Sequence, residues 1–214
     1  VSLVLALEKL NLVENSYISM GATDPENPDI RFLDVVDTNW ASILGLENDT
    51  LTKFKDRLPL VIDGETKIIN MCGDFEGNTR QYYQNSLISI ITETNFDADT
   101  LTLTEKSFKP TREKHPFIIV GVKHALKTMR EWGFRTFNEF WDESYDEIDD
   151  PVMRLAKVVE ICQYIGSWDK DKILDFRNRV KPILEHNYKA IQMDSTMRAA
   201  KQVEMIVRKH TGEI

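Results

Sequence analysis

The stretch "LTEKSFKPTREKHPFIIVG", residues 103–121, combines a charged segment with the start of a buried strand. Pro116 to Gly121 is a short run of apolar residues, which is typical of a strand covered on both faces. The charged segment sets three lysines and an arginine beside Glu105. Such charges either keep a surface loop soluble or bind a phosphorylated ligand. The pattern of the neighbouring residues distinguishes these two possibilities.

Composition excludes several classes of protein. The chain has 214 residues, 42% of them hydrophobic, with 27 basic and 35 acidic side chains, so its formal net charge is 27 − 35 = −8. That size allows a stable core, and the acidity argues against binding nucleic acid through its phosphates. No apolar run is long enough for a membrane span, and no signal peptide opens the chain. Cys72 and Cys162 have no metal-type spacing and indicate no disulfide framework, so we expect a cytoplasmic protein.

The remaining patterns predict an α/β fold. We expect strands at 16–22, 58–64, 66–72, 88–92, 115–121 and, very short, at 135–137. Helices are expected at the start of the chain, at 122–134 with Gly133 as its C-terminal cap, and from 151 almost to 214 with breaks near Gly166 and Pro182. Residues 22–60 look like an inserted loop region with a weakly helical middle. Strands alternating with helices favour one domain with a Rossmann-like parallel sheet, flanking helices and a helical C-terminal segment at about 151–214.

The segment at 93–106 is the candidate site. Glu93 ends one predicted strand, and Thr104 is a plausible N-cap of the helix that follows. Lys106 would add a full charge where a helix N-terminus already offers N–H groups and positive potential, an arrangement that suits a diphosphate. Glu105 could accept hydrogen bonds from the ribose hydroxyls of the same nucleotide. The alternative is a solvated helix end, because Glu-Lys pairs are common on protein surfaces.

These motifs resemble a known family. Tyr82, Tyr83 and Ile88 to Ile91 precede Glu93, then come Thr104-Glu105-Lys106 and the strand "HPFIIVG". This order resembles the donor-binding motif of fucosyltransferases and related glycosyltransferases built from two Rossmann-like domains (GT-B). Over about residues 80–160, including "LKTMREWGFRTFNEFWDESYDEIDDPVMR", the chain is similar to a largely uncharacterised family of glycosyltransferase-like proteins of phages and bacteria.

The resemblance implies a role for each matching residue. Glu105 would hold the ribose, and Lys106 the phosphates of a nucleotide-diphosphate sugar, the co-substrate. Arg80 would reach a phosphate, and Glu93 would orient Lys106 or touch the sugar. Thr94 stands where the fucosyltransferase pattern has Asn, so the role of Asn95 does not transfer directly. The resemblance implies no metal requirement, and it places the catalytic base in an N-terminal domain that we expect to be missing, so no base is assigned.

Two further charged clusters could bind a ligand or have a purely structural role. Lys109, Arg112, Lys114 and His115 complete the basic cluster, in which Lys109 is the next candidate ligand and His115 is more typical of a structural hydrogen-bond donor. The acidic run at 142–150 lacks the spacing of an EF-hand, and Asp150-Pro151 suits a helix start. The resemblance keeps Glu143, Ser144 and Asp146 as candidates. No Walker-type loop is present, so the alternative to a glycosyltransferase is a non-catalytic structural or assembly module that retains the fold.

Overall fold

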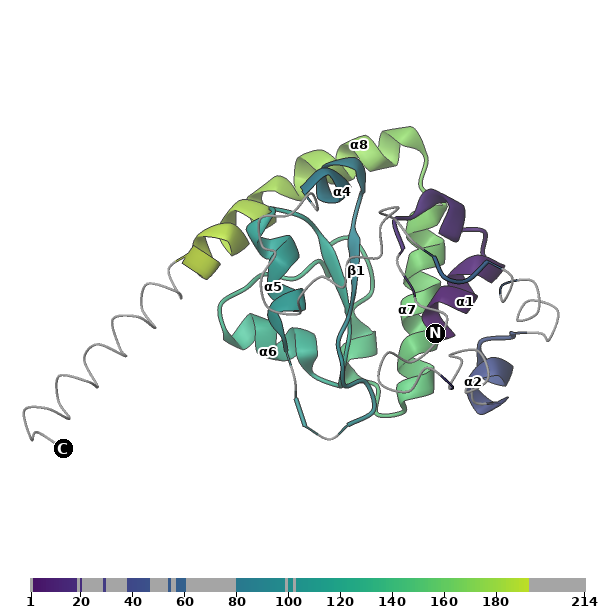
Figure 1. The fold of residues 1–214 in the computed structure, drawn as a ribbon. Coiled ribbons are helices and arrows are strands. Elements are labelled where there is room, and N and C mark those ends of the chain that lie inside the picture. Colours follow the sequence, from purple (N-terminus) through teal and green to yellow (C-terminus); the bar gives the residue numbers. More distant parts are fainter. Residues whose placement is uncertain are drawn as a thin grey trace, which may run out of the picture.

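The computed structural model describes residues 2–18, 20, 29, 38–46, 54, 57–60, 80–98, 100–101 and 103–192. Within these ranges the protein is a mixed α/β structure (Figure 1). The helices and strands are α1 (Ser2–Lys9), η1 (Val13–Asn15), α2 (Thr38–Ile43), α4 (Arg80–Asn85), β1 (Ser89–Thr92), α5 (Glu105–Arg112), β2 (Phe117–Val120), α6 (Ala125–Glu131), η3 (Ser144–Glu147), α7 (Pro151–Gly166) and α8 (Lys170–Arg179). A further helix covers residues 181–192.

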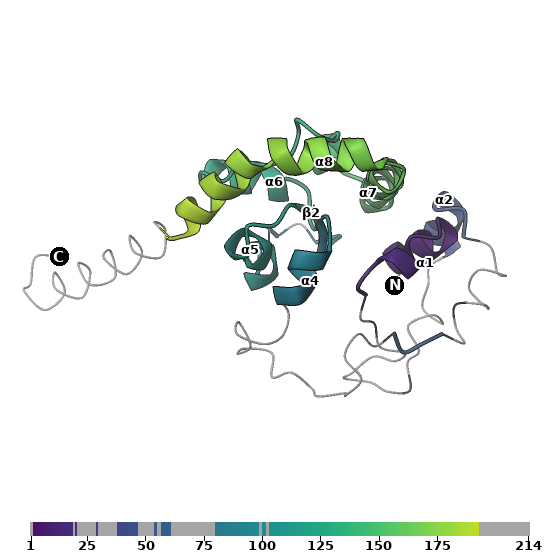
Figure 2. The ribbon, with the colours of Figure 1, turned by 90° about the horizontal axis from the view of Figure 1, so that it is seen from above.

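The centre of the fold is a parallel pair of strands joined through α5. Ser89 pairs with Phe117, and the register continues to Thr92 opposite Val120. All four residues of β2 are buried, which explains why its sequence is apolar on both faces. Seen from above, α4 and α5 lie on one side of β2, and α7 and α8 lie on the other (Figure 2). The two central strands predicted from the sequence are confirmed, and so is their parallel pairing.

The helix ends form as their sequences predict. Asp150 caps α7, where its Oδ1 accepts from the backbone N–H of Val152 at 2.8 Å, and Pro151 occupies the first helical turn. Gly133, with φ of 89°, closes α6. The N–H of Phe134 bonds the carbonyl of Met129 at 3.0 Å, and the N–H of Gly133 bonds that of Arg130 at 2.9 Å, the paired contacts of a Schellman motif.

The core lies between the sheet and the helices on the side of α7. The largest cluster joins β2 and α6 to α7 through side chains such as Ile118, Met129 and Val158, each fully buried. Aromatic rings extend it toward α8, where Phe176 contacts Trp141 and Trp168 with ring centroids 5.9 Å and 5.1 Å apart. α1 packs against α7 at the edge of this core (Figure 1).

Two predicted strands differ from the structure. Residues 135–137 form no strand, because side chains take the backbone hydrogen bonds that a strand would need: the N–H of Arg135 donates to Asn187 Oδ1 at 2.7 Å, and that of Phe137 to Glu143 Oε1 at 2.7 Å. Residues 16–18 are also not a strand, and Met20 makes only an isolated antiparallel bridge with Leu60. The rest of the strand predicted at 58–64, the one at 66–72, most of the loop region at 22–60, and residues 193–214 lie outside the described residues.

The C-terminal half is helical in the described part, with breaks close to the predicted positions. α7 ends at Gly166, α8 ends at Arg179, and Pro182 lies in the first turn of the next helix. Pro is tolerated there because the first helical N–H groups have no partner within their own helix. The weakly helical stretch around Trp40 is α2.

Candidate functional site

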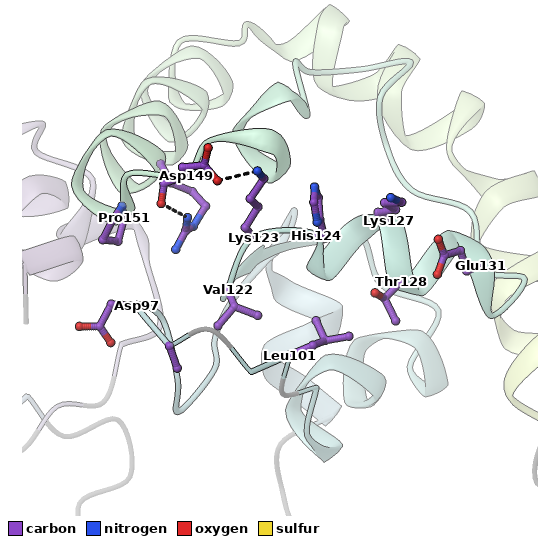
Figure 3. Close-up of a pocket in the computed structure, with 12 residues that line it drawn as sticks. Asp97, Leu101, Val122, Lys123, His124, Lys127, Thr128, Glu131, Asp149 and Pro151 are labelled. Atoms are coloured by element: carbon purple, nitrogen blue, oxygen red, sulfur yellow. Dashed lines mark hydrogen bonds and ion pairs between the residues drawn. The ribbon is translucent and has the colours of Figure 1, made fainter.

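A cleft of about 440 Å³ lies at the carboxyl edge of the sheet. Parallel strands end at the same edge, where the connections that follow them leave space for a ligand. One wall comes from the connection after β1, including Asp97 and Leu101, and the other from the residues after β2 and from α6 (Figure 3). Pro151 and Arg154, at the start of α7, complete the cleft.

Basic side chains dominate the wall after β2. Lys123 and His124 lie in the short connection between β2 and α6, and Lys127 lies in the first turn of α6. Lys123 pairs with Asp149 at 2.6 Å, a contact that holds the pKa of this carboxyl below its usual range. His124 Nε2 lies 3.3 Å from Glu147 Oε2. Within the described residues the ammonium of Lys127 contacts no carboxylate, and Lys127 is exposed. It is therefore the cation in the cleft that is most available to an anionic ligand.

Arg154 ties the strand connections to α7. Its side chain is 3% exposed and donates to the carbonyls of Gly121 at 3.1 Å, Ile148 at 2.6 Å, and Asp149 and Phe96. Burial lowers the pKa of this guanidinium, while nearby carboxylates oppose that effect, so the group stays charged at neutral pH. The four contacts use four of its five N–H donors, and all four acceptors are backbone carbonyls. Arg154 thus fixes the shape of the cleft and brings a full positive charge to it.

The N-terminus of α5 is built around Glu93, which is 6% exposed. Its carboxylate accepts from the hydroxyl of Thr104 at 2.6 Å, the N–H of Thr104 at 3.0 Å and the hydroxyl of Ser107 at 2.6 Å. Burial alone would raise the pKa of Glu93, but these hydrogen bonds outweigh it and the pKa lies below its usual range. Thr104 is the N-cap of α5, as predicted, and accepts from the N–H of Lys106 at 3.4 Å. Glu93 therefore orients the start of α5 through Thr104 and Ser107.

Glu105 and Lys106 do not line the cleft. Glu105 is exposed on the first turn of α5, and Lys106 is half-buried, with its ammonium donating to Thr94 Oγ1 at 3.1 Å. Thr94 belongs to the connection that also gives Asp97 and Leu101 to the cleft, so Lys106 contacts this connection without lining the cleft. Asn95 and Lys109 are half-buried and are absent from the cleft lining as well.

Arg80 lies at the opposite edge of the sheet. Its Nε donates to Glu113 Oε2 at 3.2 Å, just beyond the end of α5. Residues 105 and 113 are separated by eight helical rises, about 12 Å. The structure therefore does not bring Arg80 together with Lys106, and the predicted set divides between the two ends of α5.

The acidic run at 142–150 supports the fold of the cleft wall. Asp146 is 1% exposed and accepts from the N–H groups of Leu126 and Lys127, each at 2.8 Å, so it caps α6. Glu143 accepts from the N–H of Phe137 at 2.7 Å and pairs with Arg130 at 3.2 Å. Burial raises the pKa of Glu143, against the opposing effect of these contacts.

Ser144, the third candidate of this run, is exposed and bonds only the side chain of Asp142 in the described structure. None of the three candidates, Glu143, Ser144 and Asp146, lines the cleft.

The helix N-termini at this edge are therefore already occupied. Side chains accept hydrogen bonds from the N–H groups there: those of Glu93 and Thr104 at α5, that of Asp146 at α6 and that of Asp150 at α7. A phosphate in the cleft would meet side chains such as Lys127 rather than the helix-end N–H groups expected from the sequence. Lys123 and His124 could have been identified from the sequence, because they lie two and three residues after Gly121, at the end of the second predicted strand. The sequence carries no comparable signal for Arg154.

Comparisons with known proteins assign no role to the residues of the cleft. No protein-family model, no curated protein and no solved structure matches the chain. Among the described residues, no group of three His, Cys, Asp or Glu side chains could hold a metal ion. None of the helices in the described part combines the length and the apolar composition needed to cross a membrane.

Proposed function

We propose that the chain is the donor-binding, Rossmann-like half of a glycosyltransferase, which binds a nucleotide-diphosphate sugar in the cleft at the carboxyl edge. The observation that carries the proposal is the cleft itself, bounded by the connections after both parallel strands and lined by Lys123, His124 and Lys127. Ligands of open parallel sheets bind at this position. The resemblance to the donor-binding motif of fucosyltransferases supplies the substrate class.

Side chains would supply most of the positive potential. Lys127 would contact a phosphate, and the buried charge of Arg154 would favour an anion near the start of α7. Three carboxylates, on Asp97, Glu131 and Asp149, line the same cleft, so they offset part of its positive charge. Because carboxylates accept hydrogen bonds, the cleft favours a ligand that carries hydroxyl groups as well as phosphates. During transfer, Lys127 and Arg154 would stabilise the charge that grows on the leaving diphosphate. No residue is assigned as the base, and the acceptor is an unknown molecule.

A thermal-shift panel of nucleoside diphosphates tests the proposal. A ligand at a hundredfold over its Kd adds about 2.7 kcal/mol, which for a chain of this length raises Tm by about 5–11 °C. We expect one diphosphate to give such a shift, and Lys127→Ala to reduce it. Lys106→Ala separately asks whether that ammonium reaches the ligand.

The matched control is Lys170→Ala. Lys170 is an exposed lysine at the start of α8, beyond the far end of the 16-residue α7 and so about 24 Å from the cleft. This variant should keep the full shift. If no nucleoside diphosphate stabilises the folded protein, or if Lys127→Ala leaves the shift intact, the proposal is wrong.

A non-catalytic module is the second candidate, and one observation favours it. The helix N-termini at the carboxyl edge are already capped by carboxylates and a hydroxyl, and Glu105 is exposed away from the cleft. A domain that keeps this fold for assembly alone needs no ligand in the cleft. The same panel separates the two functions, because such a module would give no ligand-dependent shift while remaining folded.

A further inference from the structure

A second pocket, of about 450 Å³, lies at the amino edge of the sheet, opposite the candidate site. It is formed by α4, the residues that lead from α5 into β2, and the helix at 181–192. Its lining residues are Arg80, Tyr83, Gln84, Arg112, Glu113, Lys114, His115 and Tyr188. Three members of the basic cluster that the sequence places before β2, Arg112, Lys114 and His115, therefore line this pocket rather than the cleft.

The charge of the pocket favours an anion. Three of its lining side chains are cationic, on Arg80, Arg112 and Lys114, against one carboxylate, on Glu113. Another carboxylate lies beside them, since Glu185 pairs with Lys114 at 2.6 Å. The chain as a whole carries −8, so a basic excess confined to one pocket is a local feature.

The existing ion pairs can yield to a ligand. The side chain of Arg80 is 74% exposed where it contacts Glu113, and Lys114 and Glu185 are 42% and 51% exposed. Exposed pairs of this kind contribute little to stability, because water screens both charges. A ligand with two or more negative charges would compete well for the same cations, since charge-assisted hydrogen bonds to phosphate are among the stronger polar contacts.

The pocket also contains neutral polar side chains that are held in place by contacts with their neighbours. Burial, and to a lesser extent the nearby Arg177, lower the pKa of His115 to about 4, so the ring is neutral at pH 7. Its Nε2 lies 3.3 Å from Ser86 Oγ, and its ring meets Tyr83 edge-on with centroids 5.4 Å apart. Lys114 has a left-handed backbone, with φ of 51°, and places its ammonium 4.5 Å from the ring centroid of Tyr188. These contacts fix the walls from which the cations project.

We propose that this amino-edge pocket binds a phosphate-bearing small molecule, independently of the cleft at the carboxyl edge. Arg80 and Lys114 would exchange their present carboxylate partners for the phosphate oxygens, and Arg112 would add a third cation. The phenol of Tyr83, whose pKa burial raises, would remain a neutral hydrogen-bond donor. Arg112 and Lys114 of the basic cluster would thus bind a phosphorylated ligand, which is one of the two alternatives that the sequence leaves open, but at the amino edge of the sheet.

Pyrophosphate is the test ligand, because its two phosphate groups can meet cations on two walls. Titration of the isotope-labelled protein, followed by backbone amide NMR at constant ionic strength, should shift signals of residues 80–84 and 112–115. Arg80→Gln and Lys114→Asn should each weaken binding by about tenfold, the effect of one charge-assisted contact. Asn suits position 114 because it tolerates the left-handed backbone.

Lys127→Ala and sodium sulfate provide the controls. Lys127→Ala alters the cleft and should leave pyrophosphate binding at residues 80–84 and 112–115 unchanged, whether or not the cleft binds a nucleotide. Sulfate should bind more weakly, because it offers a single tetrahedral group. The inference is overturned if pyrophosphate leaves these signals unmoved, if Arg80→Gln and Lys114→Asn bind as the wild type does, or if sulfate matches pyrophosphate and reveals an unselective surface charge.

Discussion

Replacement of Asp146 by Asn should destabilise the fold by about 3 kcal/mol. The carboxylate is 1% exposed and accepts from two successive N–H groups of α6, both at 2.8 Å. Asn has one carbonyl oxygen in place of two carboxylate oxygens, so one of these hydrogen bonds is lost and an NH₂ group faces a backbone donor. A buried hydrogen bond to a charged group is worth about 1.5–3 kcal/mol, and a carboxylate at a helix N-terminus adds about 0.3–1 kcal/mol.

Urea unfolding monitored by circular dichroism measures this change. A loss of about 3 kcal/mol lowers the urea midpoint with an unchanged slope, and lowers Tm by about 6–12 °C for a chain of this size. Asp142→Asn is the control in the same run, because Asp142 is exposed and contacts Ser144 at the surface. It should cost less than about 1 kcal/mol. If the two variants differ from wild type by the same amount, the role given to Asp146 as the cap of α6 is wrong.

Two further predictions concern pH and backbone strain. Burial lowers the folded-state pKa of His115 from 6.5 to about 4, so as the pH falls the unfolded chain takes up a proton on this side chain before the folded protein does. The free energy of unfolding should therefore be unaffected by His115 above pH 6.5 and fall by about 3 kcal/mol as the pH drops to 4. In His115→Phe the denaturant midpoint should depend less on pH between 6.5 and 4.5, and an unchanged pH dependence would contradict the assignment. Gly133→Ala should cost about 1–2 kcal/mol in the same assay through its φ of 89° alone, since no atom lies within 4 Å of the added methyl group; a neutral effect would mean that the end of α6 rearranges.

The central strands could be predicted because their sequence and their environment agree. Apart from Ser89, all residues of the runs at 88–92 and 117–120 are β-branched or aromatic, and such runs pack well in a sheet covered by helices. Residues 135–137 have a similar local composition but form no strand. Their N–H groups bond Asn187 and Glu143, which lie 52 and 6 residues away along the chain. A local sequence pattern cannot predict the contact with Asn187, because that side chain lies 52 residues away along the chain.

The candidate site could be predicted only in part, for a related reason. The sequence predicted a site at the carboxyl edge of the sheet, where the structure has a cleft, although none of the predicted ligand residues lines it. Thr104 was identified correctly as a cap, because capping depends on a few neighbouring residues. The direction in which Glu105 and Lys106 point depends on packing around α5. The position of Arg80 depends on how α4 approaches the far end of that helix, and this is a tertiary contact.

Arg154 has a consequence for the dynamics of the protein. One guanidinium holds Phe96 after β1, Gly121 after β2 and the turn at Ile148 before α7. Three chain segments that are far apart in sequence are therefore held by the same side chain. If any one of them unfolds locally, the buried guanidinium of Arg154 loses a hydrogen-bond acceptor. The cost of that exposure links their local opening, so amide hydrogens along all three should exchange as one cooperative unit rather than as three independent loops.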